Sequence, residues 1–160
     1  SCFWVRIPCE RADVEALRPA VAEPAAGLAE ELRGLRLLVV DDEPLNRELV
    51  RHILEPAGVR ITEAGGGAEA VAAARTNPFD MILMDIRMPQ IDGPTAAQLI
   101  RTPAGLNAAT PMAAFTGETT GPAAWRGLFD AMLKKPIVSA DLLHLLAAYR
   151  LKSERPDVRG

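Results

Sequence analysis

Four polar positions in this chain follow short apolar runs, and their residue types could carry out phosphoryl chemistry. Asp41 and Asp42 follow one run, Asp85 follows a second, Thr116 a third and Lys135 a fourth. In an open α/β sheet, parallel strands deliver their carboxyl-terminal residues into one crevice, where ligands bind. We therefore expect these side chains to converge on one pocket that holds three carboxylates, a hydroxyl and an ammonium.

The crowding of carboxylates at this pocket indicates a cation. Asp41 and Asp42 are adjacent, and Asp85 adds a third negative charge, so a positive charge must lie between them. Mg²⁺ prefers oxygen ligands and typically binds one or two carboxylates plus a phosphate. A carboxylate is also a competent nucleophile for phosphoryl transfer through an aspartyl-phosphate. Lys135 could hold a phosphoryl oxygen with its charge, and the Thr116 hydroxyl could donate a hydrogen bond.

The elements that must position these residues alternate between strand-like and helical patterns. We expect strands over residues 36–40, 59–63, 80–84, 111–115 and 130–133, and helices over 44–56, 67–76, 94–102, 121–127 and 138–151. Such alternation is typical of a parallel sheet covered on both faces. Five units of this size predict an α/β, flavodoxin-like (βα)5 doubly wound sheet with strand order 2-1-3-4-5.

The flanks of this alternation predict four segments. Residues 1–8 are typical of a strand, and residues 9–35 of an Ala-, Glu- and Pro-rich linker that lacks a regular apolar face and is partly helical at best. Residues 36–151 form the predicted folded domain, and 152–160 a disordered tail. The net charge of −3 disfavours direct nucleic-acid binding. No apolar stretch approaches the ~18 residues of a membrane-spanning helix. Cys2 and Cys9 are predicted to be free thiols in a reducing cytosol.

Three segments resemble the receiver domain of two-component response regulators. They are residues 38–49 (LVVDDEPLNREL), 84–93 (MDIRMPQIDG) and 133–137 (LKKPI), and the resemblance covers residues 36–151. It implies that Asp85 accepts a phosphoryl group from a phosphohistidine on a sensor histidine kinase domain or a histidine phosphotransfer protein. It also implies a domain that catalyses its own phosphorylation and dephosphorylation, and not an independent enzyme.

The resemblance assigns a role to each residue of the pocket. Asp42, Asp85 and the backbone carbonyl of Arg87 would bind Mg²⁺, and Asp41 would act through water or as an acid in the next layer. Thr116 and Lys135 would hold the phosphoryl oxygens. A signal would leave through the face formed by residues 121–127, 130–133 and 138–151, which could also form a dimer.

The residues of these motifs are similar to those of receivers fused to hybrid sensor histidine kinases. Residues 44–47 and 88–89 carry this similarity, and residues 1–8 look like the last strand of a histidine-kinase ATP-binding domain. We therefore expect the carboxyl-terminal receiver of a bacterial, cytoplasmic hybrid kinase. The present residues contain none of the motifs for ATP binding or autophosphorylation.

Three departures from the family pattern concern the output of the domain and not its phosphorylation chemistry. Met132 stands where receivers usually carry a switching aromatic residue, and a flexible methionine can fill the same gap. The interval from Thr116 to Lys135 is about one helical turn shorter than usual, and Leu128 replaces a common glycine. We therefore expect a stunted or irregular helix over residues 121–127.

Two other functions compete with the phosphoacceptor. A degenerate receiver could serve as a docking module that is never phosphorylated, with its carboxylates retained for structure. A dinucleotide-binding domain could use Gly65, Gly67 and Asp85, because a glycine-rich turn after a strand mimics that fingerprint. The second hypothesis leaves Asp41, Asp42 and Lys135 without a function and places the glycines after the wrong strand.

Overall fold

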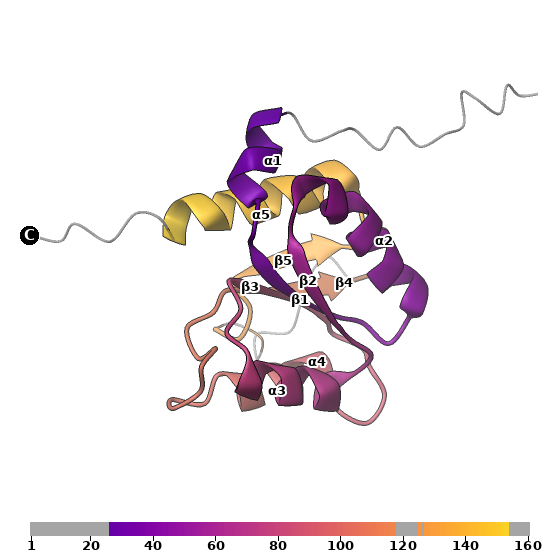
Figure 1. The fold of residues 1–160 in the computed structure, drawn as a ribbon. Coiled ribbons are helices and arrows are strands. Elements are labelled where there is room, and N and C mark those ends of the chain that lie inside the picture. The colour runs from indigo at the N-terminus through magenta and orange to yellow at the C-terminus, as the bar shows by residue number, and fades with distance from the viewer. Residues whose placement is uncertain (1–25, 118–124, 126, 154–160) are drawn as a thin grey trace, which may run out of the picture.

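The computed structural model describes residues 26–117, 125 and 127–153, and a parallel sheet lies at its centre (Figure 1). The strands are β1 (Arg36–Val40), β2 (Arg60–Ala64), β3 (Met81–Asp85), β4 (Met112–Thr116) and β5 (Ala131–Lys134). Their order is β2-β1-β3-β4-β5, and all neighbours run parallel. This order confirms the predicted flavodoxin-like, doubly wound fold.

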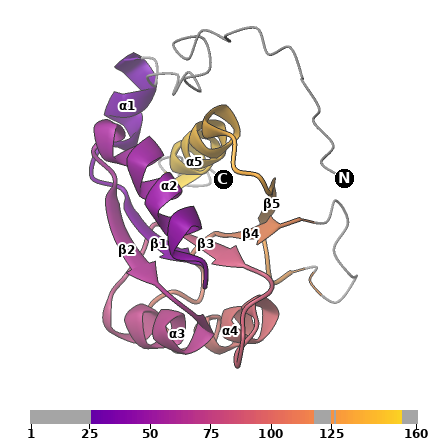
Figure 2. The same ribbon diagram turned by 90° about the vertical axis from the view of Figure 1, so that its right-hand side faces the viewer.

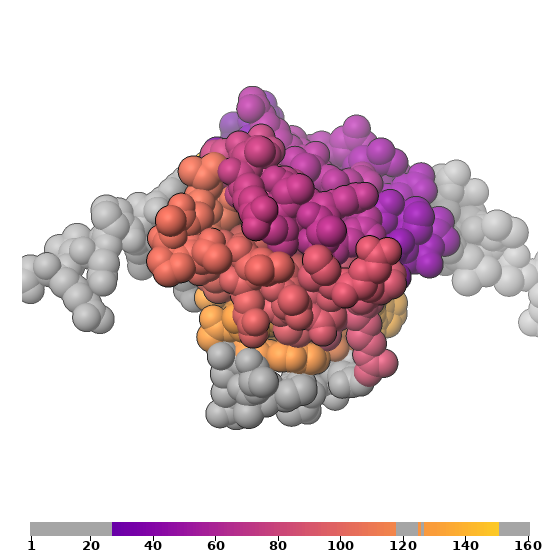
Figure 3. Space-filling model, turned by 90° about the horizontal axis from the view of Figure 1, so that it is seen from below, coloured from indigo at the N-terminus to yellow at the C-terminus, as the bar shows by residue number. Residues whose placement is uncertain are grey.

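Helices cover both faces of the sheet (Figure 1, Figure 2). One face carries α1 (Ala26–Leu32), α2 (Pro44–Leu54) and α5 (Ser139–Ser153), and the short 3-10 helix η2 (Glu55–Ala57) extends α2. The other face carries α3 (Gly67–Thr76) and α4 (Gly93–Ile100), which lie side by side in the view from below (Figure 3). Among the described residues, no helix is both long and apolar enough to span a membrane.

Each face of the sheet has its own apolar core, because side chains alternate along a strand. Leu37 and Val39 of β1 pack with α2 and α5, whereas Leu38 and Val40 pack with α3 and α4. β3 and β4 are buried along their whole length. A strand that is covered on both faces appears in sequence as a continuous apolar run, which is the pattern that predicted these strands.

Four strands begin one residue later than their patterns predicted, and for two of them the shift concerns the pocket. Asp85 is the last residue of β3 and pairs with Phe115, and Thr116 is the last residue of β4 and pairs with Lys134. Both polar residues therefore continue the ladder of the sheet instead of following it. Their backbones are held by hydrogen bonds of the sheet, which makes their side-chain positions more precise than loop positions would be.

The segment before β1 differs from its prediction. The sequence predicted a linker over residues 9–35 that is partly helical at best, and the structure forms α1 in its last part and packs this helix against α5 and η2. Leu32 and Leu35 are buried, and Leu28, one helical turn before Leu32, packs against the same core. Two leucines one turn apart are enough to anchor a short helix whose other positions are Ala, Glu and Gly.

Several predicted segments lie outside the described residues. They are the strand at 1–8, most of the linker up to residue 25, the tail from 154 onward, and the helix over 121–127 apart from Trp125 and Gly127. The last helix was predicted to end at residue 151, and α5 ends at Ser153.

Candidate functional site

The polar residues predicted from the four strand ends meet at the carboxyl edge of the sheet. Asp41 follows β1, Asp85 and Thr116 end β3 and β4, and Lys135 follows β5. A cavity of about 320 Å³ opens there, and its lining consists of Asp85, Ile86, Arg87, Thr116, Gly117 and Lys135. The topology thus brings together residues that lie up to 94 positions apart in the chain.

Lys135 joins the two buried carboxylates of this site. Its Nζ donates to Asp41 Oδ2 at 2.9 Å and to Asp85 Oδ2 at 2.7 Å. The side chain of Asp41 is 0% exposed and that of Asp85 8%, whereas that of Lys135 is 26% exposed. The backbone amide of Lys135 also donates to the carbonyl of Thr116, and the peptide bond to Pro136 is cis. One ammonium therefore neutralises part of the charge of two carboxylates.

The first turn of α2 holds Asp41 in place. Asn46 Nδ2 donates to Asp41 Oδ1 at 3.1 Å and to Oδ2 at 3.0 Å, and the backbone amide of Glu43 donates to Oδ1. Arg47 Nη1 donates to the backbone carbonyl of Asp41 at 2.6 Å. Pro44 starts α2 after Asp42 and the N-cap residue Glu43, so residues 46 and 47 lie in the first turn and face the end of β1. Hydrogen bonds therefore hold both carboxylate oxygens and the backbone carbonyl of Asp41 in place.

Asp42 completes an acidic cluster. Unlike Asp41 it is exposed, and single carboxylate oxygens of Asp41, Asp42 and Asp85 lie within 4.8 Å of one another. Carboxylate oxygens at this spacing suit a hard divalent cation such as Mg²⁺ or Ca²⁺. Because Asp41 already accepts four hydrogen bonds from side chains and a backbone amide, Asp42 and Asp85 are the better-placed direct ligands. The residues present therefore fit a divalent cation.

A tight loop carries the chain away from Asp85. The backbone amide of Arg87 donates to Asp85 Oδ1 at 3.2 Å, and the amide of Gly93 donates to the carbonyl of Ile86 at 3.1 Å. Asp92 caps α4 through a bond from the Thr95 amide. A Cβ on Gly93 would collide with the backbone of Asp85 and Ile86, so the start of α4 lies directly against the acceptor strand. The loop is closed at its base.

The electrostatics of the site follow from its partial burial. Burial raises the pKa of the Asp85 carboxyl, and the hydrogen bond from Lys135 offsets only part of this rise. Burial alone would lower the pKa of Lys135, but hydrogen bonds and charges from Asp85 and Asp41 outweigh it and raise this pKa above its usual value. Lys135 therefore keeps its ammonium charge at neutral pH. The ammonium pairs with Asp41 and Asp85, and the carboxylate of Asp42 lies close to both, so the local charge favours a further cation.

The site assembles every residue that the sequence singled out, with two differences of detail. Arg87 lines the cavity and contacts Asp85 through its backbone amide, whereas the predicted use of its carbonyl as a metal ligand stays a prediction. Asn46 and Arg47 were part of a quoted motif but had no predicted role. Both follow a helix-starting proline by less than one turn, which places them near the end of β1 but does not specify their bonds to Asp41.

Two of the departures from the family pattern lie within β5 and just before it. Met132 on β5 is 45% exposed, so it lies at the surface and not in the core. Leu128 is half-buried and packs against the core formed with α3 and α4. Its carbonyl accepts a hydrogen bond from Arg101 Nε, so the segment before β5 is attached to the end of α4.

Comparison with known proteins agrees with this geometry. The family model described as the response regulator receiver domain matches residues 37–147. The chain is 36% identical over 117 residues to the sensor histidine kinase AruS of Pseudomonas aeruginosa, covering 72% of this chain and 11% of that protein. It is 30% identical over 152 residues to the sensor protein TorS of Escherichia coli, covering 93% of this chain and 16% of that protein.

A solved structure gives the same result. It is the receiver domain of the sensor histidine kinase PA1611 from Pseudomonas aeruginosa, with a magnesium ion coordinated in the active site cleft. The two chains superpose with a TM-score of 0.67 at 29% identity, covering 73% of this chain and 98% of that one. The present chain thus matches nearly the whole of a receiver, but only a small part of the two sensor proteins.

Proposed function

The chain belongs to the family of response regulator receiver domains, and we propose that it is the phosphoacceptor of a two-component phosphorelay, with Asp85 as the acceptor. The observation that carries the proposal is the position of the Asp85 carboxylate. It lies on the wall of the cavity, 2.7 Å from the Lys135 ammonium, and Thr116 lines the same cavity. A nucleophile, a positive charge and a hydroxyl donor therefore face one space.

In the proposed reaction an oxygen of the Asp85 carboxylate attacks the phosphorus of a phosphohistidine. The P–O bond forms as the P–N bond breaks, the electron pair goes to the imidazole nitrogen, and the product is an acyl phosphate. Lys135 Nζ, which donates to Asp85 Oδ2 in this structure, would turn to an oxygen of the incoming group. The Thr116 hydroxyl would hold a second oxygen, because it ends the neighbouring strand.

We propose Asp42, Asp85 and the backbone carbonyl of Arg87 as ligands of Mg²⁺, with Asp41 acting on the ion through water. When bound, the ion offsets the repulsion between the anionic donor and the attacking carboxylate. The exposure of Asp42 and the complete hydrogen bonding of buried Asp41 support this division of roles. Arg87, at the cavity wall, is proposed to tune the lifetime of the phosphoryl group.

Phosphorylation would act as a switch. The added charge at Asp85 draws Thr116 and Lys135 toward it, and this local change biases a two-state element. We propose that the output surface comprises residues 121–127, β5 and α5, which contacts a partner or a second copy of the domain. The backbone bond between Lys135 and Thr116 supports this, since the two phosphoryl-binding residues would move together.

The wider context is also a proposal. The chain covers 11% and 16% of the two sensor proteins that it resembles, so the parent protein is larger than the present sequence if it is of their type. We propose a bacterial, cytoplasmic hybrid histidine kinase that carries this receiver at its carboxyl-terminal end, after the remnant strand at 1–8 and a linker. Its phosphodonor would be a sensor histidine kinase domain or a histidine phosphotransfer protein.

The test compares the natural chain with Asp85→Asn. Both proteins are treated with acetyl phosphate and Mg²⁺ for phosphorylation, or with beryllofluoride and Mg²⁺ for a spectral change. Phosphotransfer from candidate kinases is then measured for both. We expect a phosphorylated protein by intact mass for the natural chain and none for Asp85→Asn. Asparagine preserves the shape of the side chain but supplies no nucleophilic oxygen. A natural chain that never gains mass would instead identify the docking module without phosphorylation. Labelling that persists in Asp85→Asn would place the acceptor elsewhere.

A further inference from the structure

The glycine run between β2 and α3 has no role in the proposed reaction, yet its three members are not equivalent. A Cβ added to Gly66 would meet nothing within 4 Å, and its φ of 177° is extended backbone that any residue adopts. A Cβ added to Gly65 would meet the Glu69 carboxylate at 3.4 Å, which is ordinary contact. Only Gly67, the first residue of α3, lacks room for a side chain.

The residue that occupies this room is Ile91. A Cβ on Gly67 would lie 2.5 Å from the Ile91 carbonyl oxygen, 2.7 Å from its Cγ2 and 2.8 Å from its Cβ. Two of these atoms belong to the side chain, but the nearest is backbone, so a rotamer change of Ile91 would not remove the clash. The loop itself would have to move.

Ile91 belongs to the loop of residues 86–92 that follows the acceptor Asp85. The loop is held at its base by the bond from the Gly93 amide to the carbonyl of Ile86, and at its centre by buried Met88. Gln90 takes a positive φ of 67°, which turns the chain back toward Ile91. The contact with Gly67 is a third point of support, and it comes from a different element of the fold.

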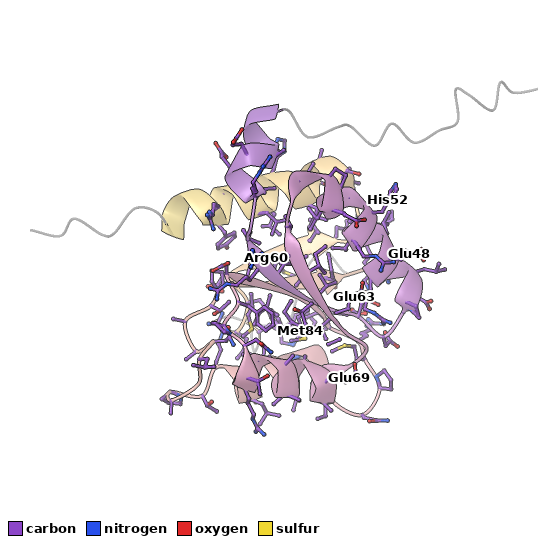
Figure 4. The ribbon with its side chains drawn as sticks, in the orientation of Figure 1. Glu48, His52, Arg60, Glu63, Glu69 and Met84 are labelled. Carbon is purple, nitrogen blue, oxygen red and sulfur yellow. The ribbon has the colours of Figure 1, made fainter. Side chains whose placement is uncertain are left out.

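The first turn of α3, on the Gly67 side of this contact, is held by hydrogen bonding and packing. The Gly65 amide donates to Glu69 Oε2 at 2.7 Å, and Glu69 lies in the first turn of α3 (Figure 4). The helix is fixed further by alanines that pack closely between it, the sheet and α4, among them buried Ala70 and Ala74. A side chain at position 67 would therefore displace the loop and leave α3 in place.

We propose that Gly67 is a positioning residue for the phosphoryl site, because its missing side chain seats the loop that carries the backbone of Arg87. The inference rests on the proposed function, in which the Arg87 carbonyl is a ligand of Mg²⁺. It extends that function to the glycine-rich join after β2, which lies on no wall of the cavity. In this proposal Gly67 positions a metal-binding loop, which gives the glycine-rich turn a role other than dinucleotide binding.

The first test needs no metal and no phosphorylation. Amide NMR spectra of the metal-free protein are compared for the natural chain, Gly67→Ala and the matched control Gly66→Ala. We expect shifts of the amides of residues 86–92 in Gly67→Ala, with those residues almost unchanged in Gly66→Ala. Equal spectra for this loop in the two variants would overturn the inference, whatever the protein does with phosphate.

The second test measures the consequence for the site. Phosphorylation by acetyl phosphate is followed against Mg²⁺ concentration for the same three proteins. We expect the half-maximal Mg²⁺ concentration to rise about 10-fold in Gly67→Ala, the low end for a residue that supports metal ligands, and to stay constant in Gly66→Ala. The final level at saturating Mg²⁺ should be retained, because Asp85 is untouched. A lower level at an unchanged half-maximal concentration would point to a general loss of folded protein.

A third variant keeps the inference testable if Gly67→Ala folds poorly. Ile91→Ala removes the Cγ2 atom from the seat, and Leu106→Ala, at a site 61% exposed, is its control. We expect a raised half-maximal Mg²⁺ concentration for Ile91→Ala only. Where all variants fold, the double variant Gly67→Ala/Ile91→Ala should raise the half-maximal Mg²⁺ concentration by less than the product of the two single fold-changes, because the effects of residues in contact are not additive in free energy. Independent effects of the two substitutions would overturn the proposed role of the contact between Gly67 and Ile91. A natural chain without phosphorylation would reject the proposed function, while the NMR result would stand by itself.

Discussion

The amino and carboxyl edges of the sheet differ in how their polar side chains are paired. At the amino edge, where the strands begin at Arg36, Arg60, Met81, Met112 and Ala131, the buried polar side chains of Asn107 and Thr110 are held by hydrogen bonds. At the carboxyl edge, where Asp41, Asp42 and Asp85 meet, the ammonium of Lys135 bridges two of the three carboxylates, Asp41 and Asp85. A polar network in which every group has a partner stabilises the fold. A network with an excess of carboxylates instead favours the binding of a cation that compensates the charge.

Asn107 shows the matched case. Its side chain is buried and makes four hydrogen bonds, which is all that an amide group needs. Oδ1 accepts from the Phe79 amide at 2.8 Å and from Thr110 Oγ1 at 3.1 Å, and Nδ2 donates to the carbonyls of Ala74 and Asn77 at 2.6 and 2.8 Å. One residue of the loop after α4 thereby fixes the end of α3 and the approach to β3.

Ion pairs extend this matching along the same edge. Arg36 and Asp80 form a two-point pair, with Nη2 to Oδ1 at 2.9 Å and Nε to Oδ2 at 3.2 Å. Arg101 donates to Asp130 Oδ2 at 2.7 Å, and the same oxygen accepts the Met112 amide that starts β4. Arg36 and Arg101 at this edge therefore each pair with a carboxylate. At the carboxyl edge Lys135 bridges two carboxylates and Asp42 lies close to both, an arrangement that could hold a cation.

The largest expected effect comes from breaking the matched edge. Asn107→Ala should lower the free energy of unfolding by about 3 kcal/mol, because it leaves several buried backbone groups without partners. Phosphorylation of the protein that remains folded should not change. Urea denaturation and labelling by acetyl phosphate measure the two quantities. The matched control is Asn77→Ala, an exposed position, with an expected loss of about 0.5 kcal/mol. Equal losses in the two variants would contradict the difference between the edges.

The second effect comes from loosening the unmatched edge. Asn46→Ala removes the two bonds that orient the Asp41 carboxylate. We expect the half-maximal Mg²⁺ concentration for phosphorylation to rise about 10-fold, as for other residues that support metal ligands. The control is Leu45→Ala, a neighbour on α2 that is 70% exposed. If Asn46→Ala lowers stability as much as Asn107→Ala and leaves the Mg²⁺ dependence unchanged, then Asn46 belongs to the structural network and not to the site.

The sequence predicted the unmatched edge better than the matched one. Asp41, Asp85 and Lys135 could be placed because strand ends of a parallel sheet meet, and their charges are informative in themselves. Asn107 could not, since a single asparagine in a loop has no periodic signal and its partners lie about thirty positions away. The role of Asn107 depends on the tertiary contact between its loop and the segment from α3 to β3, and no local sequence pattern encodes that contact.

Two further residues show why part of the site was also out of reach. Asn46 lay in a quoted motif, but its bonds to Asp41 depend on the angle at which α2 leaves the sheet. Gly67 belonged to a glycine-rich turn after a strand, and the need for a glycine at this position appears only in the folded chain, where Ile91 of another loop packs against it. By contrast, Leu28 and Leu32 did carry a periodic signal for α1, and it was diluted by the Ala- and Glu-rich composition around them.

The smallest expected effect is a difference in pH dependence between one carboxyl from each edge. The hydrogen bond from Arg36 holds the pKa of Asp80 below its usual 3.8, and burial raises the pKa of Asp85 above 3.8. Ionised Asp80 therefore contributes stability above pH 3.8 and loses it as the pH falls through its lowered pKa. Asp85 behaves in the opposite sense. Its contribution is complete below pH 3.8 and is lost as the pH rises through its raised pKa.

The two substitutions Asp80→Asn and Asp85→Asn should therefore tilt the acid side of the stability curve in opposite directions. Between neutral pH and about pH 3, the gain from protonating Asp85 opposes the loss from protonating Asp80. Asp80→Asn should flatten the acid loss of stability, and Asp85→Asn should steepen it. Urea denaturation at each pH, in EDTA so that no cation holds Asp85 ionised, gives the free energies. Lys135 does not interfere, because its raised pKa matters only above pH 10.5. An Asp85→Asn curve with a slope equal to or shallower than that of the natural chain would mean that its carboxylate is as well matched as Asp80, and the contrast between the two edges would not hold.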